Sequence, residues 1–317
     1  MQLSNSWVCL SSLDKQTTAS TVSLDNRGLA YGDGFFTTMG VLNGQILWAD
    51  YHHQRLISHA KALQFNLDAH ALLATLKTYA TQLQQGMLKL IITRAAQATR
   101  GYGYTFNKLG STCEIWLKSS TMTIGTAEQL SLGHDILIPV QPMSTTVCLS
   151  SQVACLPPSL AGLKSLNRLD NVLASAELQD IKARSLISNG LQEISEGLLR
   201  DMTGCWIEGT MSNMFYQLSE STLEESSRFP HYQDYINYLS TGQWYTPSMT
   251  QSGVAGVMRQ VIIDGLSTGS HPVVIRSLQD KDLPQLSKLF FCNALRGIMP
   301  MSSLTLLSGE VISLEAI

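Results

Sequence analysis

Residues 160–171 have the sequence LAGLKSLNRLDN, in which Lys164 stands directly before a predicted amphipathic helix. Apolar residues follow at helical spacing, and we expect them to form one buried stripe: Leu166, Leu169, Val172, Leu173 and Ala176. Such packing would fix the backbone of the lysine while its flexible stem reaches a ligand. A positioned, partly desolvated amine suits a Schiff-base lysine. Most lysines are solvated, so this interpretation depends on the rest of the chain.

The composition describes a chain long enough for two domains and a sizeable core. Its 317 residues are 44% hydrophobic and 14% charged, and the net charge is −3 with a pI near 6.2. We expect no nucleic-acid partner, because no basic stripe is present. Residues 1–7 lack the pattern of a signal peptide, and no apolar window of about 18 residues occurs. The sequence therefore predicts a cytoplasmic protein without a membrane partner.

Several common catalytic and metal-binding motifs are absent from the sequence. None of the six cysteines forms a CxxC pair, and no HExxH, Walker, complete GxGxxG or GxSxG motif occurs. We therefore expect free thiols in a reducing compartment and no metal site. The absences also argue against the commonest NTPases, dinucleotide enzymes and hydrolases.

The pattern along the chain predicts an α+β fold with two domains. Residues 1–118 are expected to form an N-terminal α+β domain, residues 119–128 a polar linker, and residues 129–317 a C-terminal domain. Residues 219–242 have little periodicity and are predicted to be an insertion between adjacent strand ends. The regular elements expected are strands at 7–13, 39–48, 87–93, 112–117, 146–150, 204–208, 213–218 and 272–277, helices at 50–64, 69–84 and 256–266, and a helix or strand at 191–199.

Four further features could form a ligand site together with the lysine. Gly253 and Gly256 precede a predicted helix whose first backbone N–H groups suit a phosphate, although an ordinary loop-to-helix junction has the same pattern. Glu208 ends a strand and could pair with a protonated ring nitrogen or lie in water. Asn293 could contact a ligand or satisfy its own turn. Arg55 could clamp a phosphate or snorkel beside the core.

A lysine, a phosphate cradle, an arginine and a carboxylate together are the protein side of a pyridoxal phosphate site. Their order resembles the fold-type IV pyridoxal phosphate enzymes, the family that contains branched-chain and D-amino acid aminotransferases. The resemblance covers nearly the whole chain and rests on segments around Tyr31, His52, Lys164, Glu208 and Gly253. It implies a smaller N-terminal α/β domain, a larger barrel-like C-terminal domain, pyridoxal 5'-phosphate as cofactor and a homodimer.

Within this family the sequence most resembles the aminodeoxychorismate lyases. Residues 164–170, KSLNRLD, are close to their lysine segment. Thr37-Thr38, the RGYGY run at 100–104 and residues 292–295 also look lyase-like. The resemblance implies conversion of 4-amino-4-deoxychorismate to 4-aminobenzoate and pyruvate in folate biosynthesis.

The resemblance also implies a role for individual residues. Lys164 would bind the cofactor covalently and then act as the catalytic base. Glu208 would pair with the pyridine nitrogen. The other cofactor-binding residues that the resemblance implies are Arg55, Ser212, Asn213, Val257, Met258, Asn293 and Ala294. The candidates for binding a small-molecule substrate, each with a structural role as the alternative, are Thr38, Arg94, Arg100 and Tyr102.

Two other functions stay open. An aminotransferase of the same family, for D-amino acids or branched-chain amino acids, would share every cofactor residue. It is disfavoured only by Thr37-Thr38 and the RGYG run. A non-catalytic pyridoxal phosphate-binding protein is disfavoured by the presence of Lys164. The sequence departs from the family at Asn26, where an aspartate is usual, in the 219–242 insertion and over residues 119–146.

Overall fold

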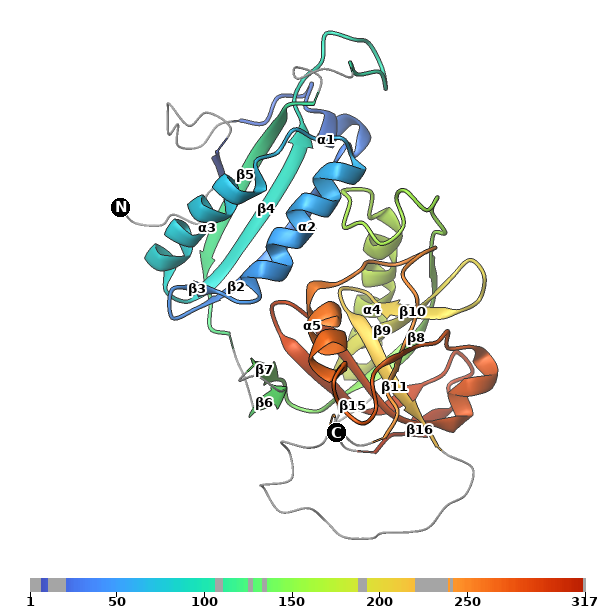
Figure 1. The fold of residues 1–317 in the computed structure, drawn as a ribbon. Helices are drawn as coiled ribbons and strands as arrows, with labels where there is room; N and C mark the ends of the chain where they lie inside the picture. Colours follow the sequence, from blue (N-terminus) through green and yellow to red (C-terminus); the bar gives the residue numbers. More distant parts are fainter. Residues whose placement is uncertain are drawn as a thin grey trace. The chain divides into compact units, whose positions relative to one another are not determined.

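The computed structural model describes residues 7–10, 21–105, 111–124, 128–132, 136–187, 193–219, 239 and 242–315 (Figure 1). The chain divides into two compact units. Unit 1 comprises residues 1–124 and 163–168, and unit 2 comprises residues 125–162 and 169–317. The sequence analysis instead assigned the short segment 163–168, which carries Lys164, to the C-terminal domain.

Unit 1 is an antiparallel sheet with two long helices. The strand order is β1-β5-β4-β2-β3, and the long central strands pair continuously, from Gly34 with Thr93 to Val41 with Gly86. The strands are β1 (Trp7–Cys9), β2 (Gly34–Leu42), β3 (Gln45–Ile46), β4 (Gly86–Arg94) and β5 (Cys113–Thr121). The helices are α1 (Arg27–Tyr31), α2 (Ala49–Ala62) and α3 (Ala69–Leu83). Strand β5 therefore includes the first three residues of the expected linker.

Alternation along β2 separates a face that packs into the core from an outer face. Phe35, Met39 and Val41 are fully buried in the core of unit 1, together with leucines of α2, α3 and β4. Because successive side chains of a strand point to opposite faces, Phe36 and Thr38 lie on the other face. Both are only half-buried.

Unit 2 is built on an 11-stranded sheet with two long helices. Its strands are β6 (Glu128–Leu132), β7 (Ile136–Val140), β8 (Ser144–Val153), β9 (Ile194–Asp201), β10 (Trp206–Gly209), β11 (Asn213–Leu218), β12 (Tyr245–Thr246), β13 (Val274–Ile275), β14 (Leu286–Asn293), β15 (Gly297–Thr305) and β16 (Val311–Ser313). The helices are α4 (Leu169–Ile187), α5 (Val257–Leu266) and the 3-10 helix η2 (Asp280–Gln285).

The strand pairings of unit 2 close into a barrel. Strand β11 pairs with β10, β10 with β9, β9 with β8, and β8 with β15, while β14 joins β15 back to β11. Closure leaves these strands without a free edge. The expected α+β class and the barrel-like larger domain are therefore confirmed.

The prediction of a buried apolar stripe after Lys164 is wrong. Helix α4 begins only at Leu169, and Leu169, Val172 and Leu173 are 79%, 58% and 67% exposed. The face that packs against β8 and β9 instead carries Ala174 and Leu178.

A polar anchor explains which face of α4 is buried. Glu177 lies between Ala174 and Leu178 on this helix, and its carboxylate accepts hydrogen bonds from the backbone and hydroxyl groups of Ser150 and Ser151, at 2.6–2.9 Å. Burial is the largest single effect and raises the pKa of Glu177, but the four hydrogen bonds together outweigh it and lower the pKa below its ordinary value. They turn the helix so that Ala174 and Leu178 face the sheet. Periodicity alone reveals an apolar stripe but not this anchor.

Most of the other expected elements are present with small shifts of their ends, but the single strand expected at 39–48 is wrong, because β2 and β3 form a hairpin with its turn at residues 43–44. The strand expected at 213–218 is β11, the helix at 256–266 is α5, and residues 191–199, left open as helix or strand, contain β9. Most of the 219–242 insertion lies outside the described residues. The strand ends beside it are adjacent, because Tyr216 of β11 pairs with Tyr245 of β12.

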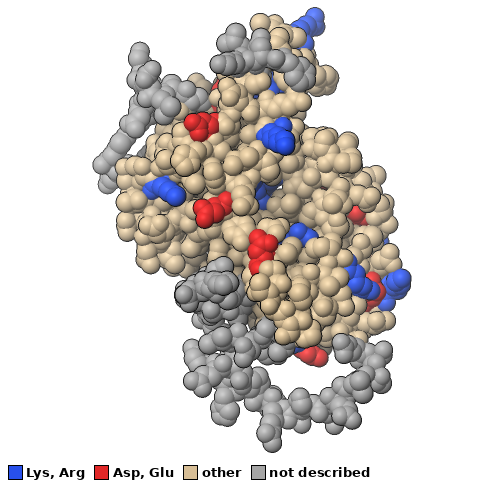
Figure 2. Space-filling model, in the orientation of Figure 1, with Lys and Arg blue, Asp and Glu red and all other residues tan. Residues whose placement is uncertain are grey.

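The described helices and one face of the surface show how apolar and charged residues are distributed. Within the described part, no helix is both long and apolar enough to cross a membrane. On the face drawn in Figure 2, acidic and basic side chains are scattered without a large patch of one sign.

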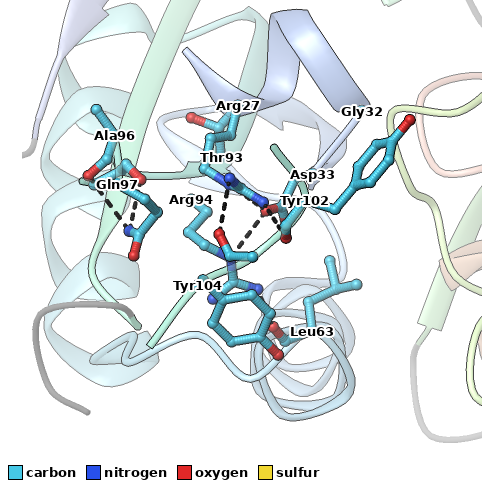
Figure 3. A network of polar contacts seen from close by, with 12 residues as sticks. Arg27, Gly32, Asp33, Leu63, Thr93, Arg94, Ala96, Gln97, Tyr102 and Tyr104 are labelled. Carbon is cyan, nitrogen blue, oxygen red and sulfur yellow. Dashed lines mark hydrogen bonds and ion pairs between the residues drawn. The ribbon is translucent and has the colours of Figure 1, made fainter. Parts of the chain in front are cut away.

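A buried ion cluster joins three parts of unit 1 (Figure 3). Asp33 Oδ2 accepts hydrogen bonds from Arg27 Nε and Arg94 Nε, both at 2.9 Å, and the two arginine side chains are only 6% and 3% exposed. Arg27 also donates to the carbonyl oxygens of residues 101–103 at 2.9–3.3 Å. One carboxylate thus compensates two buried guanidinium groups and fixes the loop after β4.

We expect Asp33→Asn to destabilise the protein by about 3 kcal/mol, because it leaves two buried arginines without their counter-charge. Urea unfolding followed by circular dichroism measures this loss. The matched control is Asp180→Asn, which removes an ion pair to Arg184 whose partners are 66% and 68% exposed. That pair should contribute less than about 1 kcal/mol. Equal midpoints for the two variants would contradict the role given to Asp33.

Candidate functional site

The backbone of Lys164 is paired with the beginning of β2. The Phe36 N–H donates to the Lys164 carbonyl oxygen at 3.0 Å, and the Leu166 N–H donates to the Gly34 carbonyl oxygen at 3.0 Å. Phe35 and Ser165 form an antiparallel bridge between them. These bonds explain why residues 163–168 belong to unit 1. They also fix the lysine on the face of β2 that carries Phe36, whose ring centroid lies 4.7 Å from Lys164 Nζ.

Thr38 lies on this same face of β2, two residues after Phe36. The structure therefore brings the predicted substrate residue Thr38 onto the lysine side of the sheet. Its neighbour Thr37 points into the core, where its Oγ1 lies 3.0 Å from His52 Nδ1. Thr37 is fully buried.

Helix α2 adds a buried arginine and a buried histidine to the lysine. Arg55 is 7% exposed and His59, one helical turn later, is 4% exposed. Burial, and then the charge of Arg168, lowers the pKa of Arg55 to about 10, so this guanidinium stays charged at neutral pH. His59 Nε2 accepts a hydrogen bond from the Lys164 N–H at 2.9 Å. The sequence analysis missed His59, although its spacing of four residues from Arg55 places both on one helix face.

The predicted ring partner Glu208 is a buried carboxylate in unit 2. It is 3% exposed, and its Oε2 accepts a hydrogen bond from the Val254 N–H at 2.8 Å. The side chain of Asn213 donates to the Val254 carbonyl oxygen at 2.8 Å. Two predicted cofactor residues, facing each other as a pair between β10 and β11, therefore hold both polar groups of Val254.

The same loop is tied to the residues that precede the lysine. Gly162 and Val254 form a parallel bridge, and the Ala255 N–H donates to the Gly162 carbonyl oxygen at 2.9 Å. Gly162 adopts a left-handed φ of 76°. Lys164 follows only two residues later in the chain.

Helix α5 begins directly after this loop with an uncapped N-terminus. Its N-cap, Gly256, has extended dihedral angles and no side-chain capping bond. The first N–H groups, those of Val257 and Met258, lie where backbone donors and the helix dipole favour a phosphate. A Cβ on Gly256 would lie 1.9 Å from Asn213 Oδ1, and one on Gly253 would lie 3.0 Å from Glu208 Oε2. Both glycines are therefore required for the close approach of this loop to the two side chains.

A second buried carboxylate, missed by the sequence analysis, shapes the turn after Glu208. Glu196 accepts hydrogen bonds from the backbone and hydroxyl groups of Thr210 at 2.9 and 2.5 Å and from the Ser212 hydroxyl at 2.6 Å. A Cβ on Gly209 would lie within 2.8 Å of the Glu196 side chain. Ser212, expected at the cofactor, donates its hydroxyl to this carboxylate. Its contact with a cofactor stays a prediction.

Asn293 uses its side chain in its own turn. Its Oδ1 accepts hydrogen bonds from the N–H groups of Leu295 and Arg296 at 3.1 and 2.8 Å. The geometry therefore shows the turn-forming alternative, with Ala294 inside the turn. Cofactor contacts of Asn293 and Ala294 stay predictions.

The three substrate candidates at the end of β4 and in the loop after it differ in burial. The Arg94 guanidinium is bound by Asp33, donates to the Leu63 carbonyl oxygen at 2.6 Å, and lies 3.8 Å from the ring centroid of Tyr104. This geometry favours the structural alternative for Arg94. Arg100 is exposed, and Tyr102 is 83% exposed with its ring 5.1 Å from that of Tyr31. Their substrate roles stay predictions.

The residues present fit pyridoxal phosphate. Unit 1 supplies a lysine amine, and unit 2 supplies a buried carboxylate and a helix N-terminus without a side-chain cap, which are the kinds of group that this cofactor requires. The described residues include no group of three or more potential metal ligands.

Comparison with known proteins shows the family to which the chain belongs. Residues 34–304 match the model of the amino-transferase class IV family, and the chain belongs to this family. Membership implies pyridoxal phosphate as the cofactor.

Particular relatives narrow the comparison. The chain is 24% identical over 285 residues to an aminodeoxychorismate lyase of Vibrio harveyi, covering 90% of this chain and 88% of the relative. The crystal structure of 4-amino-4-deoxychorismate lyase from Pseudomonas aeruginosa is 28% identical, with a TM-score of 0.68 and coverage of 90% and 88%. A branched-chain amino acid aminotransferase of Escherichia coli shares the fold, with 16% identity, a TM-score of 0.66 and coverage of 95% and 86%.

We expect Gly256→Ala to destabilise unit 2 by about 1–3 kcal/mol, because the added methyl group displaces the buried Asn213. The variant should also lose cofactor on dialysis faster than the unmodified protein. Urea unfolding and the absorbance of retained pyridoxal phosphate measure the two effects. The control is Gly269→Ala, where a Cβ would meet only the Leu266 carbonyl oxygen at 3.4 Å. Wild-type stability of Gly256→Ala would show that the loop does not depend on this close approach.

Proposed function

We propose that this protein is a pyridoxal phosphate-dependent lyase that converts 4-amino-4-deoxychorismate to 4-aminobenzoate and pyruvate. The observation that carries the reaction is similarity over 90% of the chain to two proteins named as this lyase. The buried Glu208, the uncapped start of α5 and the fixed backbone of Lys164 support the cofactor. A place in folate biosynthesis follows from the product.

The proposal gives each part of the site a task. Bound pyridoxal phosphate supplies an electron sink for a carbanion next to the substrate amine. Glu208 keeps the ring nitrogen protonated by its negative charge. Arg55 and the N–H groups of Val257 and Met258 hold the phosphate. Lys164 first binds the cofactor covalently, and its released amine then removes the proton from C4 of the substrate.

The products follow from what lies beside the C4 carbanion. The bond from C3 to the enolpyruvyl oxygen breaks as the ring becomes aromatic, which gives 4-aminobenzoate. The enolpyruvate that leaves takes up a proton at its methylene carbon and becomes pyruvate. An aminotransferase would instead have to leave the amino group of its substrate on the cofactor, because an amino acid has no such leaving group. A leaving group and the gain of aromaticity therefore favour elimination.

The alternative from the same family is an aminotransferase for D-amino or branched-chain amino acids. It shares the predicted cofactor residues, so the site geometry does not separate the two. Retention of pyridoxal phosphate without either activity would indicate the non-catalytic alternative.

The reaction is tested with enzymatically made aminodeoxychorismate. We expect equal amounts of pyruvate and 4-aminobenzoate without any added 2-oxo acid. Borohydride reduction of the resting protein should fix the cofactor on Lys164, which peptide mass spectrometry detects. D-alanine and leucine should convert the cofactor to its amine form slowly or not at all. Fast conversion by an amino acid, with no pyruvate from aminodeoxychorismate, would establish the aminotransferase instead.

Glu208→Gln should lower kcat by about two to four orders of magnitude while the protein still folds and binds cofactor. The amide oxygen can still accept the Val254 N–H, so the substitution removes the charge and keeps the geometry. Steady-state kinetics and the absorbance of bound cofactor separate turnover from binding. The control is Glu310→Gln, at an exposed turn. Near wild-type turnover of Glu208→Gln would exclude this carboxylate as the ring partner.

The homodimer and the cytoplasmic location stay predictions. The molar mass in solution tests the first.

A further inference from the structure

The peptide group that precedes the Cα of Lys164 is held from both ends. Its N–H donates to His59 Nε2 at 2.9 Å, and its carbonyl oxygen, that of Leu163, accepts a hydrogen bond from the Arg168 guanidinium. The next peptide group is held through the Lys164 carbonyl oxygen by the Phe36 N–H. The position and orientation of the lysine Cα–Cβ bond are therefore set by these contacts.

The hydrogen bonds around His59 fix which ring nitrogen carries the proton. A backbone N–H can only donate, so Nε2 must accept from Lys164 and the proton must lie on Nδ1. Nδ1 lies 3.2 Å from Ser58 Oγ, and this hydroxyl in turn donates to the Arg55 carbonyl oxygen at 3.1 Å. In this series of hydrogen bonds, from the Lys164 N–H through His59 and Ser58 to the Arg55 carbonyl oxygen, every donor therefore meets an acceptor.

The surroundings of His59 keep its ring neutral, as the acceptor role demands. Burial, followed by the positive charges of Arg55, Lys164 and Arg168, lowers the pKa of His59 to about 3. An imidazolium would lose the acceptor at Nε2 and would add a fourth positive charge. At neutral pH the ring is therefore uncharged and can accept the Lys164 N–H.

We propose that His59 is a positioning residue for Lys164, holding the lysine backbone so that its amine is aimed at one place throughout the reaction. The inference rests on the proposed function, in which the amine both binds the cofactor and moves a proton. The Lys164 amine bonds first to the cofactor and then to a proton during that cycle, so its side chain must be mobile. A fixed backbone must therefore keep the amine directed toward the same place. An aromatic ring on a long helix gives a more rigid anchor than a water molecule would.

Three substitutions of His59 separate hydrogen bonding from packing. In His59→Gln the amide oxygen reaches the position of Nε2 and can accept the Lys164 N–H. In His59→Asn the side chain is polar but too short to reach it, and in His59→Leu it cannot accept at all. The matched control is His53→Leu, which changes a half-buried histidine of the same helix whose ring centroid lies 6.0 Å from that of His70.

The readouts are amide hydrogen exchange of the peptide that covers residues 163–166, kcat and KM, and the pH at which the absorbance of lysine-bound cofactor changes. We expect at least tenfold faster exchange and about a ten- to hundredfold lower kcat in His59→Asn and His59→Leu, with KM changed less than about twofold. The pH of the absorbance change should shift in both variants. His59→Gln should restore all three quantities to within about threefold of the unmodified protein. Because His59→Asn keeps a polar side chain, it serves if His59→Leu does not fold.

The outcomes distinguish the two proposals. Borohydride labelling of another lysine in the unmodified protein would overturn the proposed function itself. Labelling of Lys164, with wild-type exchange and kcat in His59→Asn, would overturn the role of His59 alone. Equal losses in His59→Gln and His59→Leu would also overturn it, because the acceptor would then not be the quantity that matters.

Discussion

The structure depends on the backbone pairing between residues 164–166 and the beginning of β2. Through it, a segment that follows part of unit 2 in the sequence is joined to strand β2 of unit 1. Buried backbone groups must find partners, and this pairing supplies them for the segment. It also explains how a flexible side chain such as that of Lys164 can be aimed, because everything up to its Cβ is fixed.

Hydrogen bonds also fix the backbone around the predicted site residues of unit 2. Glu208 and Asn213 use their side chains to hold the backbone of Val254, and Glu196 does so for the turn that follows Glu208. Each buried carboxylate or amide forms hydrogen bonds with backbone groups of a loop or turn that lies outside the regular strands. The loop at the start of α5 therefore owes its shape to polar side chains and to glycines that let them approach. Under the proposed function, the shape of this loop and cofactor binding are linked because Glu208 serves both.

Elements whose pattern lies within a few neighbouring residues could be predicted from the sequence. Contacts between residues far apart in the sequence could not. The bounds of β11 and the start of α5 follow from alternation and from glycines before an apolar period. The burial of Arg94 against Asp33 joins residues 61 positions apart, and no local pattern reveals it. The departure at Asn26 has a similar cause: its side-chain amide donates to Glu114 Oε2 at 2.7 Å, which the family's usual aspartate could not do. His59 lay within reach of sequence reasoning, but its acceptor role required the position of the Lys164 N–H.

The discontinuous make-up of unit 1 has a consequence for synthesis on the ribosome. Its sheet strands and helices are complete by residue 124, yet its last segment ends at residue 168. At about 5–20 residues per second, the edge of β2 near Gly34 and Phe36 waits roughly 2–9 s for its partner. During that time its backbone donors and acceptors are open to other strands, so the nascent chain presents an unprotected sheet edge to the crowded cell.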